Sequence, residues 1–333
     1  MMKITKHKIF YSNSIKSESN LNYKQQLVVD ELNRKIRLNL IEMEFVKCLC
    51  GGKGFDLIAK KERYRIDQDT VICKDCGLIQ STPRMTEEGY KEFYSSDTYR
   101  KLYSPNLLDN NDYEYMKIVN FYNNRHDFIK KFVSKDSQIL EIGCGAGWNL
   151  YNFYNKGYDI YGYDYGSNFV DFGKSKGLNL TTGSIDDIKE KNVGFILLAH
   201  VFEHFLNPLK ELGKIKKILA DDGLLYIEVP DSEKFGIQLL QHAHTYYFTK
   251  NTLIHFVTTL GFKAVAHSKQ LPGNSIGVIF KKSNIINDDF LKDNEYKKMV
   301  NLIQKYDKKL HIKSLLEKMR IFDVLNGIRK LFK

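Results

Sequence analysis

From residue 137 onward, short apolar runs alternate with stretches in which apolar residues recur at helical spacing. Strands that are separated in this way by helices form a parallel sheet that helices cover on both faces. The pattern therefore predicts an α/β fold with a doubly wound, mostly parallel sheet. Its strands are expected at 139–142, 158–163, immediately before 181, 195–199, 224–229, 263–267 and 275–281, with helices at 209–220 and 251–260.

The rest of the chain divides into segments of different composition. Residues 1–44 are polar and basic and include a helical pattern at 23–40, so we expect an N-terminal arm that packs on the next module. Residues 45–112 contain two cysteine pairs and then a tyrosine-rich linker. The sheet domain should occupy 113–282, and 283–333 should form a basic helical tail. The apolar stripe of this tail favours packing on its own chain or a second subunit over weak contact with an anionic membrane surface.

Three glycines, Gly143, Gly145 and Gly147, alternate with other residues directly after the first predicted strand of the sheet. Glycine permits positive φ and lets a ligand lie against the main chain, and the helix that follows offers unpaired N–H groups. A dinucleotide site would read G-x-G-x-x-G, whereas the spacing here is G-x-G-x-G. Glu141, two residues before the first glycine, suits a cationic ligand such as S-adenosylmethionine better than a pyrophosphate. A glycine-rich turn that only closes a strand is the simpler alternative.

The segment at 140–147, Leu-Glu-Ile-Gly-Cys-Gly-Ala-Gly, resembles the first motif of the class I S-adenosylmethionine-dependent methyltransferases. Two further segments are similar to this class: His-Val-Phe-Glu-His at 200–204, with Asn-Pro behind it, and Gly-Leu-Leu-Tyr-Ile-Glu-Val-Pro at 223–230. The resemblance covers roughly 45–282. It implies a Rossmann-like sheet of seven strands and S-adenosylmethionine as the cofactor.

An acid, Asp164, ends the second predicted strand. In a doubly wound sheet, an acid at this position reaches the ribose hydroxyls of a nucleotide, although a turn residue or helix cap is the alternative for Asp164 alone. Ser184 and Ile185 lie in a segment that resembles the adenine-contacting segment of the class. The residue types of this segment are explained equally well by a helix N-cap. We therefore expect the cofactor to contact Glu141, Gly143, Gly145, Gly147, Asp164, Ser184, Ile185 and His200.

Catalytic residues are expected at the C-terminal ends of the fourth and fifth strands, where ligands bind in open α/β sheets. Methyl transfer to a hydroxyl or carbon acceptor needs a general base, and histidine suits that role near neutral pH. The resemblance implies that Glu203, His204, His242 and His244 face the acceptor. We expect His244 first as the base, then His204 oriented by Glu203. The alternative is that some of these histidines only hydrogen-bond loops.

Four of the five cysteines form two close pairs, Cys48 with Cys50 and Cys73 with Cys76, and a glycine follows each pair. This spacing fits a four-thiolate zinc ribbon, although the first pair is C-x-C rather than C-x-x-C. Free thiols or disulfides are the alternative, and a reducing cytoplasm disfavours disulfides. Because all four thiolates would bind the metal, no position would remain for water, and the zinc would be structural.

Composition and charge narrow the classes of function. A hydrophobic content of 43% is that of a globular chain. The formal net charge is +11, but the charges are scattered except near the C-terminus, which disfavours nucleic acid as a partner. No run of about 18 apolar residues predicts a transmembrane helix, and the N-terminus lacks the apolar region of a secretory signal. A cytoplasmic location is therefore expected, and the sequence does not indicate an oligomeric state.

The order of zinc module, tyrosine-rich linker and sheet domain resembles methyltransferases of bacterial polysaccharide and deoxysugar pathways. Its cysteine module is similar to that of nucleotide-sugar C-methyltransferases, which also have a further C-terminal α/β domain and a Tyr-His-Glu-His site. Here 241–244 reads Gln-His-Ala-His and only the tail follows the sheet domain, so O-methylation is at least as expected as C-methylation. The resemblance implies a small-molecule acceptor: a sugar, nucleotide-sugar or polysaccharide precursor. The alternatives are an RNA methyltransferase and a non-catalytic zinc-ribbon interaction protein on a methyltransferase fold.

Overall fold

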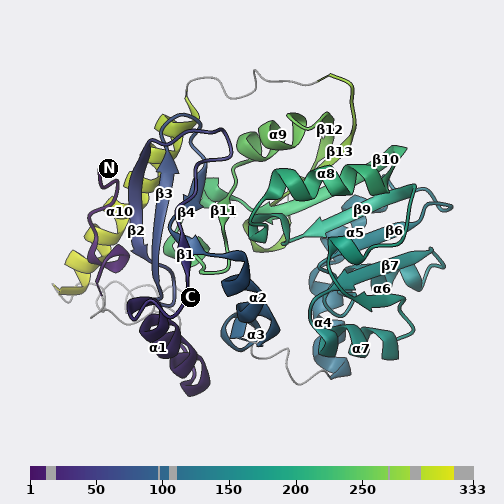
Figure 1. Ribbon diagram of the computed structural model, residues 1–333, viewed down its shortest axis with the longest axis horizontal. Helices are drawn as coiled ribbons and strands as arrows, with labels where there is room; N and C mark the ends of the chain where they lie inside the picture. The colour runs from purple at the N-terminus through teal and green to yellow at the C-terminus, as the bar shows by residue number, and fades with distance from the viewer. Residues whose placement is uncertain (13–19, 97, 105–110, 269–270, 286–293, 319–333) are drawn as a thin grey trace, which may run out of the picture.

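The structure is a computed structural model of the 333-residue chain. A large sheet with helices forms one side of the molecule and a small sheet forms the other (Figure 1). Two short helices, α2 (Glu87–Ser95) and α3 (Thr98–Tyr103), lie between these two bodies (Figure 1). The structure describes residues 1–12, 20–96, 98–104, 111–268, 271–285 and 294–318.

The large sheet consists of β6 (Ile139–Ile142), β7 (Ile160–Asp164), β8 (Leu180–Thr182), β9 (Val193–Ala199), β10 (Leu219–Pro230), β12 (Phe262–His267) and β13 (Ser275–Lys282). Their order across the sheet is β12-β13-β10-β9-β6-β7-β8. Strands β6 to β10 pair in parallel, whereas β13 is antiparallel to both of its neighbours. This order confirms the predicted mostly parallel sheet of seven strands.

Helices cover both faces of the large sheet. They are α4 (Asp112–Phe121), α5 (Asn123–Ile129), α6 (Trp148–Tyr154), α7 (Ser167–Ser175), α8 (Pro208–Ile218) and α9 (Lys250–Thr258). One face packs on α5, α6 and α7 through residues such as Leu150 and Val170, and the other packs on α8 and α9 through Leu212 and Phe256. Because both faces are covered, all four residues of β6 are buried.

The small sheet has the strand order β11-β4-β3-β2, and all of its pairs are antiparallel. Its strands are β2 (Phe55–Lys61), β3 (Asp67–Cys73), β4 (Ile79–Ser81) and β11 (Tyr246–Tyr247). The last of these comes from the sequence of the large domain, and its Tyr246 pairs with Gln80. The segment directly after His244 is therefore a strand of the N-terminal sheet.

The N-terminal helix α1 (Tyr23–Arg37) packs with α2 and α3 in a separate core that contains Val29, Leu32, Phe93 and Leu102. A short pair of strands, β1 (Met43–Glu44) and β5 (Arg84–Met85), joins α1 to the small sheet. The first residues of the chain also reach this sheet, because the Ile4 N–H donates to the Leu57 carbonyl at 2.8 Å.

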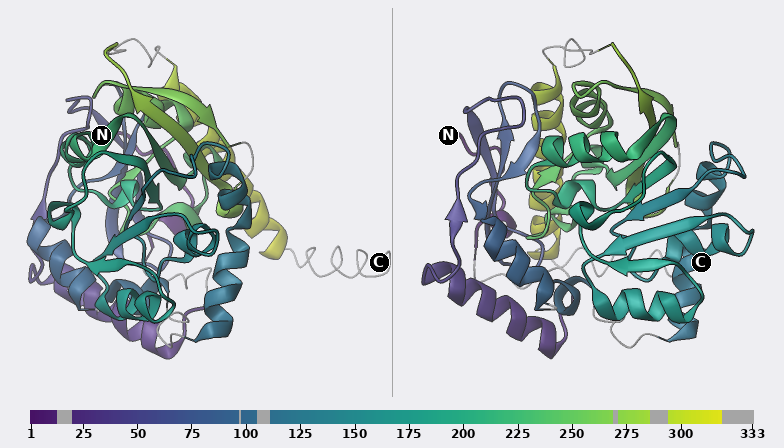
Figure 2. Two further views of the ribbon diagram at one scale, coloured as in Figure 1. Left: turned by 90° about the vertical axis from the view of Figure 1, so that its right-hand side faces the viewer. Right: turned by 45° about the vertical axis from the view of Figure 1, so that its right-hand side comes forward.

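The C-terminal helix α10 (Glu295–Lys318) lies against the small sheet, beside the N-terminal segment of the chain (Figure 2). Met299 and Ile303 of α10 share a core with Ile58 and Ile72 of β2 and β3. The remainder of the predicted tail, 286–293 and 319–333, lies outside the described residues. Among the helices that are described, none is long and apolar enough to cross a membrane.

Candidate active site

The glycine loop that follows β6 has the backbone that its sequence predicts. Gly143, Gly145 and Gly147 have φ values of 71°, 56° and 74°, in the left-handed region that only glycine adopts readily. A Cβ added to Gly145 would lie 2.2 Å from the Trp148 ring, so this position has no space for a side chain. A Cβ added to Gly143 would lie 2.4 Å from a methyl group of Val201, so the loop after β9 lies directly beside the glycine loop.

Asp164 lies at the end of β7 and holds the glycine loop in place. Its carboxylate accepts hydrogen bonds from the N–H groups of Gly145 at 2.8 Å and Gly166 at 2.7 Å. It also pairs with Arg100 of α3, whose Nη2 lies 3.2 Å from Oδ1. The Arg100 guanidinium in turn covers the Phe169 ring at 4.1 Å. Arg100 was not predicted as a site residue, because its only signal in the sequence was its place in the tyrosine-rich linker.

Glu141 is buried on β6 beneath the glycine loop, with 1% of its surface exposed. Asn149 donates to one carboxylate oxygen, and the other has no hydrogen-bond partner among the described residues. Burial raises the pKa of Glu141 to about 8. A buried carboxylate with an unpaired oxygen is suited to a cationic ligand, because a positive charge would compensate its desolvation. The loop, Asp164 and Glu141 thus fit the chemistry of S-adenosylmethionine.

The segment after β8 forms a capped turn. Ser184 Oγ accepts from the Asp186 N–H at 3.1 Å, and Asp187 accepts from the Ser184 N–H at 2.7 Å. These two bonds form the N-cap of a short 3-10 helix, Ile185–Asp187, which was one of the two explanations offered by the sequence. Contact of Ser184 and Ile185 with adenine stays a prediction.

His200 follows β9 and lies between two buried glutamates. Its Nε2 is 3.2 Å from Glu228 Oε1, and its Nδ1 is 3.5 Å from Glu203 Oε1. Burial lowers the pKa of His200, but the two carboxylates raise it more, to about 9. Arg125 completes this row of charges with two 2.6 Å bonds to Glu228. His200 is therefore a cation held by glutamates, and its predicted contact with the cofactor stays a prediction.

Glu203, His204 and His244 converge beside this row. The His204 and His244 rings are 4.9 Å apart, and His204 Nε2 lies 3.9 Å from Glu203 Oε1. His204 Nδ1 is 2.9 Å from the Ala243 carbonyl oxygen. Because a carbonyl only accepts, Nδ1 carries the proton and Nε2 keeps its lone pair.

His244 has an unpaired nitrogen as well. Its buried Nδ1 has no hydrogen-bond partner in the described part of the chain. Burial lowers the pKa of His204, and it lowers the pKa of His244 further below the usual value. Both imidazoles are therefore neutral at neutral pH, which is the form that a general base requires.

His242 lies outside this convergent group. Its Nδ1 is 2.9 Å from Gln68 Oε1 on β3, and its ring packs on Phe93 of α2 at 5.9 Å. These contacts attach His242 to the N-terminal module. Its predicted role at the acceptor stays a prediction, and the observed bonds correspond to the alternative of a histidine that holds a loop.

The N-terminal module holds the whole loop at 241–245 that carries His242 and His244. Ser81 of β4 donates its hydroxyl to the His244 carbonyl and its N–H to the Thr245 carbonyl, both at 3.0 Å. Tyr90 of α2 donates to the His242 carbonyl at 3.1 Å. This support was not predicted, because nothing in the local sequence links positions more than 150 residues apart, as Tyr90 and His242 are.

Tyrosines of α2 and α3 cover the convergent group. The Tyr94 hydroxyl lies 3.1 Å from His204 Nδ1, and the Tyr99 ring is 5.9 Å from the His204 ring. Tyr99 and Arg100 are neighbours in the chain, so α3 contacts the histidines with one residue and Asp164 with the next. The tyrosine-rich linker therefore spans from the glycine loop to the histidines.

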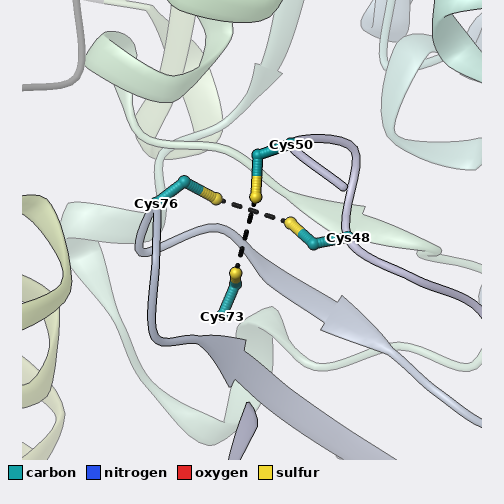
Figure 3. Close-up of side chains that lie close together, drawn as sticks. All are labelled: Cys48, Cys50, Cys73 and Cys76. Atoms are coloured by element: carbon teal, nitrogen blue, oxygen red, sulfur yellow. Dashed lines mark hydrogen bonds between the residues drawn. The ribbon is translucent and has the colours of Figure 1, made fainter. Parts of the chain in front are cut away.

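The four paired cysteines gather at the knuckles of the small sheet, with their sulfur atoms pointing toward one another (Figure 3). Cys48 Sγ lies 3.4 Å from Cys76 Sγ, and Cys50 Sγ lies 3.7 Å from Cys73 Sγ. Tetrahedral zinc with bonds of about 2.3 Å requires sulfur atoms about 3.8 Å apart. The cysteines are free thiols, and their spacing fits a metal ion rather than disulfides.

Comparison with known proteins supports a methyltransferase domain. Residues 111–268 match the family model described as a methyltransferase domain. This match agrees with the order and direction of the seven strands and supports a methyltransferase domain over this region. A search among curated proteins gives no match to the chain.

Solved structures resemble the chain at low sequence identity. One is the 1,6-didemethyltoxoflavin N1-methyltransferase of Burkholderia thailandensis with S-adenosylhomocysteine bound. The match is 16% identical, covers 63% of this chain and 97% of that protein, and has a TM-score of 0.49. The match to an S-adenosylmethionine-dependent methyltransferase from Aquifex aeolicus is 19% identical, covers 50% of this chain and 97% of that protein, and has a TM-score of 0.41. The match to another from Archaeoglobus fulgidus is 15% identical, covers 51% of this chain and 100% of that protein, and has a TM-score of 0.41. Similarity at this level does not extend to the acceptor.

Proposed function

We propose that the chain transfers a methyl group from S-adenosylmethionine to a small molecule, namely a sugar, nucleotide-sugar or polysaccharide precursor. The observation that carries this proposal is the meeting of two groups at one edge of the large sheet. Glu141 and Asp164 surround the glycine loop, and the neutral pair His204 and His244 lies beyond the adjacent loop at Val201. A cofactor site thus adjoins a base.

The reaction divides between cofactor and chain. S-adenosylmethionine supplies a methyl group on a positively charged sulfur, which keeps the bonding electron pair when the methyl leaves. The chain orients the two reactants and takes the proton of the acceptor hydroxyl, or of an acidic C–H group. His244 Nδ1 is suited to take this proton, because it is buried, neutral and without a partner among the described residues. Glu203 and His204 lie beside it to orient the acceptor.

The surroundings of the histidines support a small acceptor over RNA. Tyr94, Tyr99 and the loop at 241–245 enclose the histidines between the two bodies of the molecule. An RNA substrate would require an open groove with basic residues and exposed rings for stacking. The cysteine centre is proposed as structural zinc that holds the small sheet, with Cys48, Cys50, Cys73 and Cys76 as ligands.

The first test is calorimetric titration with S-adenosylmethionine and S-adenosylhomocysteine on protein whose zinc content is measured. We expect micromolar binding together with zinc in the cysteine centre. Radiolabelled methyl transfer to a panel of nucleotide-sugars and free sugars would then identify the acceptor class. Transfer to RNA but to none of the sugars would overturn the acceptor proposal. Absence of cofactor binding in zinc-loaded protein would overturn the enzyme proposal and favour a non-catalytic interaction protein.

A further inference from the structure

Glu203, His204 and His244 can each direct one ligand atom to a common point. The three atoms lie within 4.8 Å of one another, and the residues come from two different loops of the sheet edge. Ligand atoms around a tetrahedral zinc ion are separated by about 3.4 Å, since each bond is about 2.1 Å long. Movements of roughly 1 Å in these side chains would therefore bring all three atoms within bonding distance of one ion.

A backbone carbonyl holds His204 in the orientation that metal binding needs. His204 donates Nδ1–H to the Ala243 carbonyl, which leaves Nε2 available for a metal ion. The buried Nδ1 of His244 has no hydrogen-bond partner among the described residues and is available as well. Metal-ligating histidines almost always have an outer hydrogen bond like that of His204, which fixes the ring and its tautomer.

The Glu203 carboxylate is buried without hydrogen bonds to its oxygens from the described residues, although the His200 cation lies near it. Only 1% of its surface is exposed, and neither oxygen accepts a hydrogen bond from the described residues. His200 Nδ1 at 3.5 Å and His204 Nε2 at 3.9 Å are its nearest charged or ionisable neighbours. Burial of a carboxylate without close hydrogen bonds is costly, and a bound cation would compensate it.

We infer that Glu203, His204 and His244 form a second metal site, which binds a divalent first-row metal ion such as Zn²⁺. Two imidazoles and one carboxylate suit such a metal and leave positions open for other ligands, unlike the closed four-thiolate centre. This site is distinct from the cysteine centre in both ligand type and place in the fold.

The open positions give the metal a role that rests on the proposed function. With the metal bound, His244 Nδ1 would be a ligand, so a hydroxide bound at another position of the ion would take the proton in its place. An acceptor hydroxyl bound to the ion would have its pKa lowered, and transfer of its proton would convert that hydroxide to water. The acceptor oxygen would then form the new bond to the methyl group, while the cofactor sulfur keeps its electron pair. Acceptors with two adjacent oxygens, such as a diol or a hydroxyketone, would bind best because both oxygens reach the ion.

The test is metal analysis of the full chain after equilibration with Zn²⁺ and removal of unbound metal. We expect one zinc ion in the cysteine centre and a second that is lost in Glu203→Gln and in His244→Ala. His126→Ala is the matched control, since it removes a buried histidine of α5 that lies outside the group and its loops, and this variant should retain both ions. Circular dichroism and titration with S-adenosylmethionine verify that each variant is folded.

Two results would overturn the metal site: wild-type protein that retains zinc only in the cysteine centre, and a second zinc that persists in Glu203→Gln. Either result leaves the proposed function standing if methyl transfer is observed. Conversely, a second zinc in protein that does not bind S-adenosylmethionine would support the site and overturn the proposed function. The two proposals therefore fail independently.

Discussion

At the scale of single residues, the site is organised by buried charges that compensate one another. Arg125, Glu228, His200 and Glu203 form a row in which positive and negative groups alternate. Burying a single charge is costly, and a partner at hydrogen-bond distance recovers much of that cost. Asp164 follows the same rule, because Arg100 and two backbone N–H groups surround its carboxylate.

Replacing Asp164 with alanine should weaken the binding of S-adenosylmethionine. The variant loses the bonds that hold Gly145 and Gly166, together with the expected ribose contact, and we expect a loss in affinity of roughly 10-fold or more. Calorimetric titration measures this change. Asp171→Ala on α7 is the control, since its carboxylate is largely exposed and should leave affinity unchanged. Equal affinities in the two variants would contradict the assignment of the site.

His200 should make the free energy of unfolding depend on pH in the alkaline range. Its pKa is raised from 6.5 to about 9 in the folded protein, so the charged form stabilises the fold. This stabilisation is complete at pH values below the pKa of the histidine in the unfolded chain, 6.5, and it is lost as the pH rises through the folded-state pKa of about 9. Urea unfolding of wild type and His200→Gln at several pH values should show a difference that shrinks with rising pH. A constant difference would show that the imidazole is not charged.

At the scale of elements, the shortest strand of the small sheet has the largest consequence. β11 contains only Tyr246 and Tyr247, yet its pairing with β4 fixes the end of the loop that carries His244. Gln68 on β3 adds side-chain bonds to His242 and to the Gln241 carbonyl. The N-terminal module therefore packs next to the large sheet and also positions part of the candidate active site.

Replacing Gln68 with alanine should lower kcat and leave cofactor affinity unchanged. The loop would lose its buried bonds to Gln68 while the glycine loop stays intact, and a misplaced base costs about 10-fold or more in rate. Methyl-transfer kinetics and calorimetry on the same sample separate the two effects. Lys60→Ala on the neighbouring strand β2 has only a surface ion pair to lose and is the control. An unchanged kcat would show that the loop is held without Gln68.

At the scale of the whole molecule, the first residues of the chain, helix α10 and the cysteine centre are connected through the N-terminal module. Asp307 of α10 accepts hydrogen bonds from the N–H groups of Lys6 and His7. Three of the four cysteines are buried, and they share a core with residues of the large domain such as Leu253 and Phe256. Disturbing the cysteine centre should therefore affect the entire fold.

The variant Cys73→Ser should lose zinc and stability together, because the free energy of metal binding contributes to folding. Metal analysis and thermal unfolding of the same preparation measure both changes. Cys144→Ala provides the control, since it removes the fifth cysteine, which lies in the glycine loop, and should keep the zinc. Full metal content and an unchanged melting temperature in Cys73→Ser would overturn the zinc proposal.

The elements of the large sheet were predictable from the sequence because their signals are local. The strands at 139–142 and 275–281 and the helix at 251–260 match β6, β13 and α9 to within one residue at each strand end and two at each helix end. Before the first strand of the sheet, α4 and α5 are separated at Tyr122. A break of this kind depends on packing, which periodicity does not report.

The sequence by itself determined the glycine loop, the acid at the end of β7 and the grouping of four cysteines, because each depends on residue type and short spacing. Only the tertiary structure decided which histidines meet, since His204 and His244 converge while His242 is bonded to Gln68. It also decided that Arg100 pairs with Asp164 and that β11 completes the small sheet. These are contacts between distant positions, and they form only when the two sheets and the helices between them are packed together.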